Sequence, residues 1–264
     1  MFNYNFKPQS IPRRKLLIAT TSLFPINHAN SKEIKQLHET IKDVVTKQKS
    51  PVALRLVFHD AFTYDLKTNT GGLNASIQYE LDRPDNAGLK RGWHLVEVVK
   101  DTLKGTNLEN VSCADIIALL GAQAVTKCGG PIIDVSLGRI DTNKADPDGR
   151  LPDLKSTAKE LKDNFASKGF SVKELVVLSG AHTLGSKGYG DPYTFDNAYY
   201  KELLKKPWND KNNSMASMIG IPTDHVLPED EECLPYIYMY AHDQNMFFKD
   251  FSEAYKKMVN LGLQ

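Results

Sequence analysis

The sequence predicts a mostly α-helical protein, and three observations support that fold class. Apolar residues recur with the period of a helix over most of the chain beyond residue 31. Capping residues, Gly and Pro mark where these periods begin and end. One short segment alone, residues 132–137, has the composition of a strand. At 264 residues, the chain can bury a large core, as one domain or as two lobes.

The first predicted helix covers residues 31–49. Its apolar side chains form one stripe and lysines fill the remaining faces, as in a surface helix that packs one face inward. Asn30 or Ser31 can cap its start. Pro51 stands where the first turn of a helix tolerates proline, so a second helix is expected to follow directly.

A cation and an imidazole interrupt the apolar run of this second helix. Arg55 and His59 are spaced i and i+4, so both side chains leave the same face. Arginine stays charged and histidine can take and return a proton, which suits a reaction that moves a proton while negative charge develops. From this stretch alone, a buried network of Arg55, His59 and Asp60 that only braces the core is an equally good interpretation.

Residues 63–86 are rich in Gly, Asn, Thr and Asp and predict a long loop, a kind of segment that is often functional. The next part of the chain alternates helices with turns. Ser112 and Asp115 resemble a capping box with Asp in place of Glu. The helices predicted in this part cover residues 89–103, 112–125 and 158–165, with a turn-rich connector at 138–152.

A second chemically informative helix is predicted at residues 171–185, opened by a Ser-x-x-Glu capping box and closed by a glycine. His182 lies on its buried face near the end. A histidine there can coordinate a metal through one ring nitrogen if a carboxylate or carbonyl orients the other, and Asp224 is the candidate partner. Segments 195–204 and 235–261 predict the remaining helices, the last of them very aromatic.

The first thirty-one residues differ from the rest of the chain. Residues 1–32 contain no Asp or Glu, and a basic stretch precedes the mildly apolar run 16–26, which is too short and too polar to span a bilayer. This pattern favours a targeting segment over residues 1–31, and the alternative is a disordered native terminus.

Charge and cysteine content exclude several classes of protein. The formal net charge is +1, so nothing indicates nucleic acid as a partner. Three cysteines are too few for a disulfide framework, and their spacing does not match a zinc site. Buried free thiols are the expected state.

Two motifs together resemble the signature of the plant, fungal and bacterial haem peroxidase superfamily. They are Arg-Leu-Val-Phe-His-Asp at 55–60 and Leu-Ser-Gly-Ala-His-Thr-Leu-Gly at 178–185. Shorter matches follow in order, and the resemblance covers roughly residues 32–261. Within the superfamily the chain is similar to class I, and among these to the plastid ascorbate peroxidase-related group.

The resemblance implies a two-lobed helical fold with one haem b between the two histidine-bearing helices. The domain would occupy residues 32–264, with a distal lobe of about residues 32–150 and a proximal lobe of about 151–250. It also implies that hydrogen peroxide is reduced to water through a high-valent iron-oxo intermediate. A small-molecule one-electron donor and a plastid location complete the expectation, with no membrane span.

The resemblance assigns roles to particular residues. His182 is expected to be the axial iron ligand, with Asp224 hydrogen-bonded to its other ring nitrogen. His59 is expected to move the peroxide proton, Arg55 to stabilise the developing charge, and Asn86 to hold His59 as a proton acceptor. Weaker matches place Phe58, Pro51, Pro152 and Phe251 along the haem, and Thr183, Thr194 and Asp196 around a monovalent cation such as potassium.

Departures from the family pattern bear on the electron donor. Phe58 replaces the tryptophan that precedes the distal histidine in ascorbate peroxidases, and Tyr193 takes the place of the proximal tryptophan. The segment between His182 and Asp196 is shorter than in the family and lacks the arginine that grips ascorbate. Lys49 stands where a substrate-contacting cysteine is expected. A donor other than ascorbate at the usual site is therefore predicted.

Two alternatives stand beside the catalytic hypothesis. One is a non-catalytic member of the fold with a structural or interaction role, and retention of Arg55, His59, His182 and Asp224 argues against it. The other is a haem-binding sensor or carrier without turnover, which the same four residues do not exclude.

Overall fold

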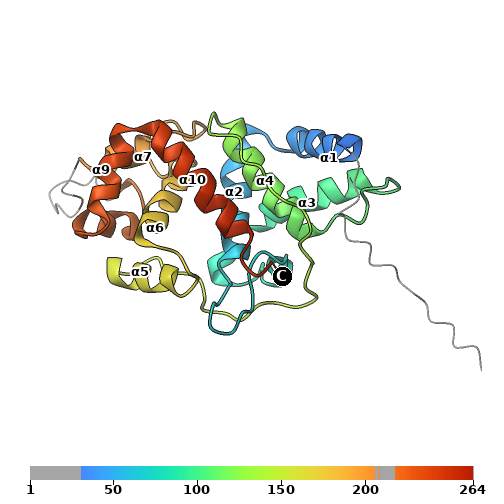
Figure 1. Ribbon diagram of the computed structural model, residues 1–264, viewed down its shortest axis with the longest axis horizontal. Helices are drawn as coiled ribbons and strands as arrows, with labels where there is room; N and C mark the ends of the chain where they lie inside the picture. Colours follow the sequence, from blue (N-terminus) through green and yellow to red (C-terminus); the bar gives the residue numbers. More distant parts are fainter. Residues whose placement is uncertain (1–30, 206–207, 209–217, 264) are drawn as a thin grey trace, which may run out of the picture.

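The structure is a computed structural model and describes residues 31–205, 208 and 218–263 (Figure 1). Over these residues the chain forms helices α1 to α10 and short 3-10 segments, without a β-strand. One isolated bridge joins Asp65 to Thr70. The predicted helical class is confirmed, whereas the strand predicted at 132–137 is wrong. That segment has no regular secondary structure, and no strand among the described residues pairs with it.

Helices from the first half of the chain pack together around α4, whose side chains are almost all buried. The group comprises α1 (Ser31–Val44), α2 (Ser50–Ala61), α3 (Lys90–Leu103) and α4 (Cys113–Lys127). Gly121 lets α2 approach α4 closely, because a Cβ atom there would lie 2.4 Å from Val57 Cγ2. The helix that carries Arg55 and His59 is therefore clamped against the centre of this group.

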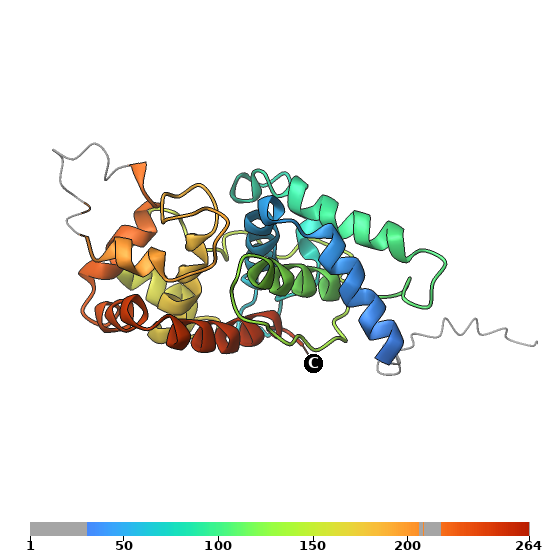
Figure 2. The same cartoon turned by 90° about the horizontal axis from the view of Figure 1, so that it is seen from above.

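Helices from the second half form another group, seen on the left in Figures 1 and 2. The group comprises α5 (Ala158–Ala166), α6 (Val172–Ser179), α7 (Ala198–Leu203), α8 (Pro222–Val226) and α9 (Leu234–His242). The last helix, α10 (Gln244–Val259), contacts α6 and α9 and also reaches α2. Its Tyr255 hydroxyl donates to the Ala118 carbonyl of α4 at 2.7 Å, so α10 ties the two groups together.

Helix ends differ from the sequence prediction at several places, and the helix predicted at 171–185 ends at Ser179. The helix predicted at 31–49 ends at Val44 and is followed by a 3-10 turn, Lys47–Lys49. The aromatic helix predicted at 235–261 is two helices that meet at Asp243, whose carboxylate caps α10 by accepting from the Met246 N–H at 2.9 Å. The apolar period continues across this break, so only the cap reveals it.

The two predicted capping boxes behave differently. Ser171 and Glu174 form a complete box at the start of α6. Ser112 accepts from the Asp115 N–H, but the Asp115 carboxylate turns away and accepts from the N–H groups of Gly138 and Arg139. A shorter Asp side chain thus ties the irregular segment 131–142 to α4 instead of closing the box.

The loop at residues 63–86 contains two short 3-10 turns, as expected of a segment with little regular structure. It is fastened to α2 through Asp60, which is fully buried. The Asp60 carboxylate accepts from the N–H groups of Asn74, Ala75 and Ile77 at 2.8–3.1 Å. The loop that ends at Asn86 is therefore held by the residue that follows His59.

The remaining sequence predictions concern the N-terminal segment, membrane spans and the cysteines. The targeting segment predicted at 1–31 lies almost wholly outside them, and the division of the chain at residue 31 stays a prediction. Over the described part of the chain, no helix is long and apolar enough to cross a membrane. Cys113, Cys128 and Cys233 are free, and the last two are buried, as expected.

Candidate active site

His59 is held in one tautomer by the loop that faces α2. Its Nδ1 lies 2.8 Å from Asn86 Oδ1, and the Asn86 amide nitrogen donates to the Glu80 carbonyl at 2.9 Å. Because that bond uses the amide nitrogen, the amide oxygen faces the imidazole, and Nδ1 must donate. His59 Nε2 is thereby left with its lone pair, as a proton acceptor.

Arg55 lies one turn before His59 and faces the same nitrogen. Its Nε donates to His59 Nε2 at 3.2 Å, and its terminal nitrogens donate to the Ala87 carbonyl at 2.8 Å and the Asp85 carbonyl at 2.6 Å. Burial lowers the pKa of Arg55, partly countered by Asp85. Burial and the Arg55 charge lower the pKa of His59 to about 4, against the opposing effect of Asn86. His59 is therefore neutral at physiological pH.

His182 lies just beyond α6, on a 3-10 turn, Gly180–Thr183, because the α-helix ends at Ser179. Its Nδ1 is 2.7 Å from Asp224 Oδ1, as the sequence predicted. The side chain is 39% exposed, and within the described residues no hydrogen bond engages Nε2. Burial lowers the pKa of His182, but the carboxylate of Asp224 more than offsets this and raises it overall.

Asp224 is 1% exposed and has two aromatic partners that the sequence did not reveal. The hydroxyls of Tyr189 and Tyr199 each donate to its carboxylate at 3.0 Å. Tyr193, predicted to replace the proximal tryptophan, is 38% exposed instead, with its backbone N–H bonded to Asp191. That expectation is wrong: no local spacing indicates which tyrosine reaches Asp224, because the choice depends on how the turn before α7 folds back.

The two histidine-bearing segments meet at one end. A Cβ atom added to Gly185, three residues after His182, would lie 3.5 Å from Pro51 Cβ at the start of α2. Pro51, Phe58 and Pro152 are each partly buried, and Phe58 stacks on Phe62 with ring centroids 4.1 Å apart. These side chains are partly exposed, and the expectation that they line a flat cofactor stays a prediction.

Phe251 differs from the other predicted lining residues. It is 1% exposed and packs among Phe195, Phe247 and Tyr255, with ring centroids 4.8 to 6.2 Å away. The structure places it in the aromatic core rather than on an open face. Core residues surround its side chain. A helical stripe of aromatic residues does not by itself show which of them lies in the core and which lines a cofactor.

The predicted cation residues are only partly brought together. Thr183 Oγ1 donates to Asp196 Oδ1 at 3.0 Å, and the same oxygen accepts from the Ala198 N–H at the start of α7. Thr194 lies two residues before Asp196, and its N–H bonds to the Asp191 carbonyl. Asp196 therefore accepts the first N–H of α7, in addition to any role toward a cation.

The donor set at His182 fits a haem better than a bare metal ion. Among the described residues, no three His, Cys, Asp or Glu side chains gather around a common point. A single imidazole with one ring nitrogen oriented by a carboxylate can hold a metal whose other ligands arrive with it, as in a haem. The side-chain chemistry around His182 thus matches an axial haem ligand.

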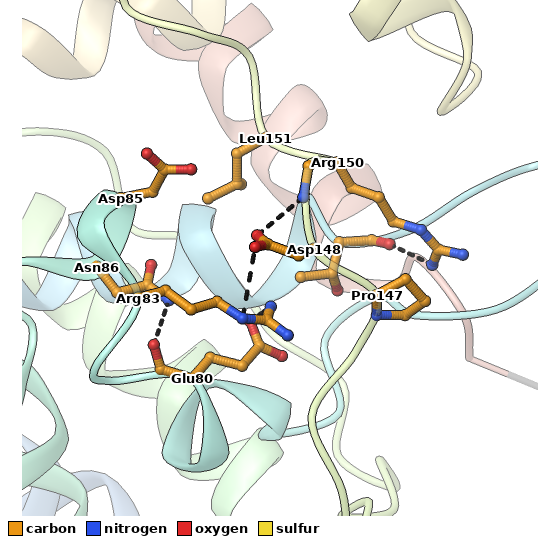
Figure 3. A pocket seen from close by; sticks show the side chains of 10 residues that line it. Glu80, Arg83, Asp85, Asn86, Pro147, Asp148, Arg150 and Leu151 are labelled. Carbon is orange, nitrogen blue, oxygen red and sulfur yellow. Dashed lines mark hydrogen bonds and ion pairs between the residues drawn. The ribbon is translucent and has the colours of Figure 1, made fainter.

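A small pocket beside Asn86 shows how the loop is braced (Figure 3). Arg83 forms an ion pair with Glu80 at 2.7 Å and donates to the Asp146 carbonyl at 2.6 Å. On the other wall Arg150 donates to the Thr63 carbonyl at 2.7 Å. Both guanidinium groups are used by the protein, so the pocket supports Asn86 rather than offering a free cationic site.

Comparison with known proteins decides the family. The family model described as Peroxidase matches residues 32–243. The chain belongs to the peroxidase family. It is 49% identical over 256 residues to a protein of Arabidopsis thaliana named "Putative L-ascorbate peroxidase 6", covering 95% of this chain and 77% of the relative.

Two further relatives come from Oryza sativa subsp. japonica. "Probable L-ascorbate peroxidase 4, peroxisomal" is 40% identical, over 81% of this chain and 73% of its own length. "Probable L-ascorbate peroxidase 7, chloroplastic" is 35% identical, over 87% and 71% respectively. These matches confirm the class I haem peroxidase predicted from the motifs, an oxidoreductase that uses haem, hydrogen peroxide and an electron donor.

Proposed function

We propose that this peroxidase reduces hydrogen peroxide with Arg55, His59 and Asn86 on one side of the haem and His182, held by Asp224, as the iron ligand on the other. One observation carries the proposal. Each histidine has its Nδ1 engaged, one by an amide oxygen and one by a carboxylate, so that His59 Nε2 keeps a lone pair that faces Arg55 Nε, and His182 Nε2 has no hydrogen bond within the described residues. When bound, the haem supplies the redox-active iron at which the O–O bond is cleaved.

The protein residues handle protons and charge in this reaction. His59 Nε2 accepts a proton from hydrogen peroxide and returns it to the departing oxygen, which leaves as water. The Arg55 guanidinium, fixed by two loop carbonyls, stabilises the negative charge on that oxygen. Asn86 keeps the Nε2 lone pair available. Two one-electron donors then supply the two electrons, and two protons are taken up with them, as the reduction of one peroxide to two water molecules requires.

The cofactor is proposed to be haem b, with a potassium ion near Thr183, on the 3-10 turn that carries His182. The sequence has no C-x-x-C-H motif for covalent haem attachment, which favours haem held by His182 and by packing alone. The contact between Thr183 and Asp196 supports the position of a cation, together with Thr194 nearby. A metal titration of the holoenzyme with potassium, sodium and calcium would test the second part.

The electron donor is proposed to differ from ascorbate at the usual haem-edge site. Lys49, at the position of the expected cysteine, is exposed, and its ammonium donates to the Val44 carbonyl at 3.3 Å. Three similar proteins carry ascorbate peroxidase in their names, so ascorbate belongs in the test. A donor panel of ascorbate, phenols, thiols and cytochrome c, each read as kcat/KM, would identify the preferred class.

A plastid location is proposed for the protein, with the haem domain at residues 32–264. The acid-poor, basic start of the chain supports it, as does the similarity to a chloroplastic relative. The peroxisomal name of another relative supplies the competing location. Imaging of the full chain fused at its C-terminus to a fluorescent protein would distinguish the two.

Rapid mixing of the haem-loaded protein with hydrogen peroxide tests the central proposal. We expect haem uptake, followed by a fast change of the haem absorption spectrum and turnover with a reducing donor. If the protein takes up no haem, the proposal fails. Haem uptake without a spectral change on mixing would leave the carrier or sensor alternative in its place.

A further inference from the structure

The carboxylate that orients His182 is shared by four hydrogen-bond donors. Oδ1 of Asp224 accepts from His182 Nδ1 at 2.7 Å and from the Tyr199 hydroxyl at 3.0 Å. Oδ2 accepts from the Tyr189 hydroxyl at 3.0 Å and from the Ile221 N–H at 3.1 Å. Three donors other than the histidine therefore stabilise the negative charge of this buried side chain.

Each additional donor weakens the pull of the carboxylate on the His182 proton. A carboxylate whose charge is already stabilised by hydrogen bonds is a weaker acceptor toward the next donor. A ligand histidine that donates to a strong acceptor becomes a more basic ligand, so a weakened acceptor makes it less basic. Tyr199 shares Oδ1 with His182 directly, whereas Tyr189 binds the other oxygen. The effect of Tyr199 should be the larger.

The two phenols are held firmly in these positions. Tyr189 and Tyr199 are buried and contact each other edge to face, with ring centroids 4.8 Å apart, and the Tyr199 ring meets His182 at 6.0 Å. Gly220 has a φ of +76°, and a Cβ there would lie 2.0 Å from the Tyr189 hydroxyl oxygen. The backbone therefore makes room for this hydroxyl at Asp224.

We propose that Tyr189 and Tyr199 are positioning residues that limit how strongly Asp224 polarises His182, and that they thereby raise the reduction potential of the iron. The inference rests on the proposed function, because it takes His182 as the iron ligand. A less basic axial histidine stabilises the ferric state less, which shifts the ferric–ferrous equilibrium toward ferrous.

The test is the ferric–ferrous midpoint potential of the haem-loaded protein and of Tyr→Phe variants. We expect Tyr199→Phe and Tyr189→Phe to shift the potential to more negative values, Tyr199→Phe by more. For the double variant we expect about a tenfold change in the equilibrium, which is 59 mV for one electron. The iron–histidine stretching frequency of the ferrous protein should rise in the same order.

Tyr200→Phe is the matched control. Tyr200 is also fully buried and neighbours Tyr199, but its hydroxyl donates to the backbone carbonyls of Val176 and Val177 at 3.1 and 3.2 Å. Its loss should leave the potential unchanged. A shift in Tyr200→Phe as large as in Tyr199→Phe would show a general packing effect and overturn the inference.

A substitution that should shift the potential in the opposite direction controls for variants that misfold. Tyr199→3-fluorotyrosine keeps the ring and the hydroxyl but makes the phenol a stronger donor, so the potential should move to more positive values. No shift, or shifts of the reverse sign in either series, would refute the inference. If the unsubstituted protein takes up no haem, or if His182→Ala retains it unchanged, the proposed function itself fails.

Discussion

His59 and His182 are the same residue type in two opposite electrostatic settings. His59 is bonded through Nδ1 to the neutral amide of Asn86 and faces the Arg55 cation, whereas His182 is bonded through Nδ1 to the carboxylate of Asp224. Burial disfavours the charged form of both rings. The pKa of His59 falls to about 4, but that of His182 is raised because a carboxylate opposes the burial. The partner on Nδ1, rather than the burial, separates the proposed proton acceptor from the proposed metal ligand.

Removing the proposed proton acceptor, His59, should have the largest effect of the changes that test this comparison. We expect His59→Ala to slow the reaction of the haem-loaded protein with peroxide by about 10²- to 10⁴-fold, since a positioned general base contributes on that order. Haem content, read from absorbance, should not change. His94→Ala is the control, because His94 is exposed and its ring pairs with Glu97. A normal rate in His59→Ala would invalidate the mechanistic assignment.

Removing the proposed iron ligand, His182, should weaken haem binding. We expect His182→Ala to lose haem about 10- to 100-fold faster or more, because even the outer partners of a metal ligand change affinity on that order. Transfer of haem to excess apomyoglobin measures this rate. His225→Ala is the control, since His225 follows Asp224 in α8 and its Nε2 bonds to the Ile219 carbonyl. Equal haem loss in both variants would count against His182 as the ligand.

Substitution of Asn86, the residue bonded to His59 Nδ1, tests whether this partner controls the histidine. Asn86→Asp places a carboxylate at His59 Nδ1, as at His182, and should raise the pKa of His59. Asn86→Ala removes the acceptor and frees the ring to adopt the wrong tautomer. We expect about a tenfold slower reaction with peroxide in each case at neutral pH or below, again measured by rapid mixing. An unchanged rate in Asn86→Ala would show that the loop does not select the tautomer.

The pH dependence of the peroxide reaction tests the lowered pKa of His59. Burial and Arg55 bring this pKa to about 4, below the ordinary value of about 6.5. The group is protonated, and inactive as a base, only below its own pKa. The rate should therefore stay constant from neutral pH downward and fall with a midpoint near pH 4. A midpoint near 6.5, or one that persists in His59→Ala, would contradict this account.

The smallest effect is expected from the carboxylate that fastens the loop to α2. Burial raises the pKa of Asp60 to about 7, so its contribution to stability is present at low pH and is lost as the pH rises through that value. Asp60→Asn turns an amide N–H toward backbone N–H groups and should lower the free energy of unfolding by about 1–3 kcal/mol. Urea unfolding at pH 5 and pH 8 should show the larger difference from the unsubstituted protein at pH 5. A difference that grows with pH would refute the sign.

Short-range patterns in the sequence determined the helical class and the main site residues. The i, i+4 spacing of Arg55 and His59, the proline that starts their helix and the capping box of α6 depend on neighbours within one or two turns, so the local sequence suffices. Asp224 was the candidate partner of His182 from its residue type and again from a family motif, and the structure brings these two side chains together.

The tertiary structure alone decided which side chains surround these residues. Tyr189 and Tyr199 reach Asp224, whereas Tyr193 points outward and Phe251 is enclosed in the core. Such outcomes depend on how turns and helices distant in the sequence pack, and a tyrosine has the same local preferences in each case. A buried carboxylate must find donors, but only the folded chain determines which donors are within 3 Å of it.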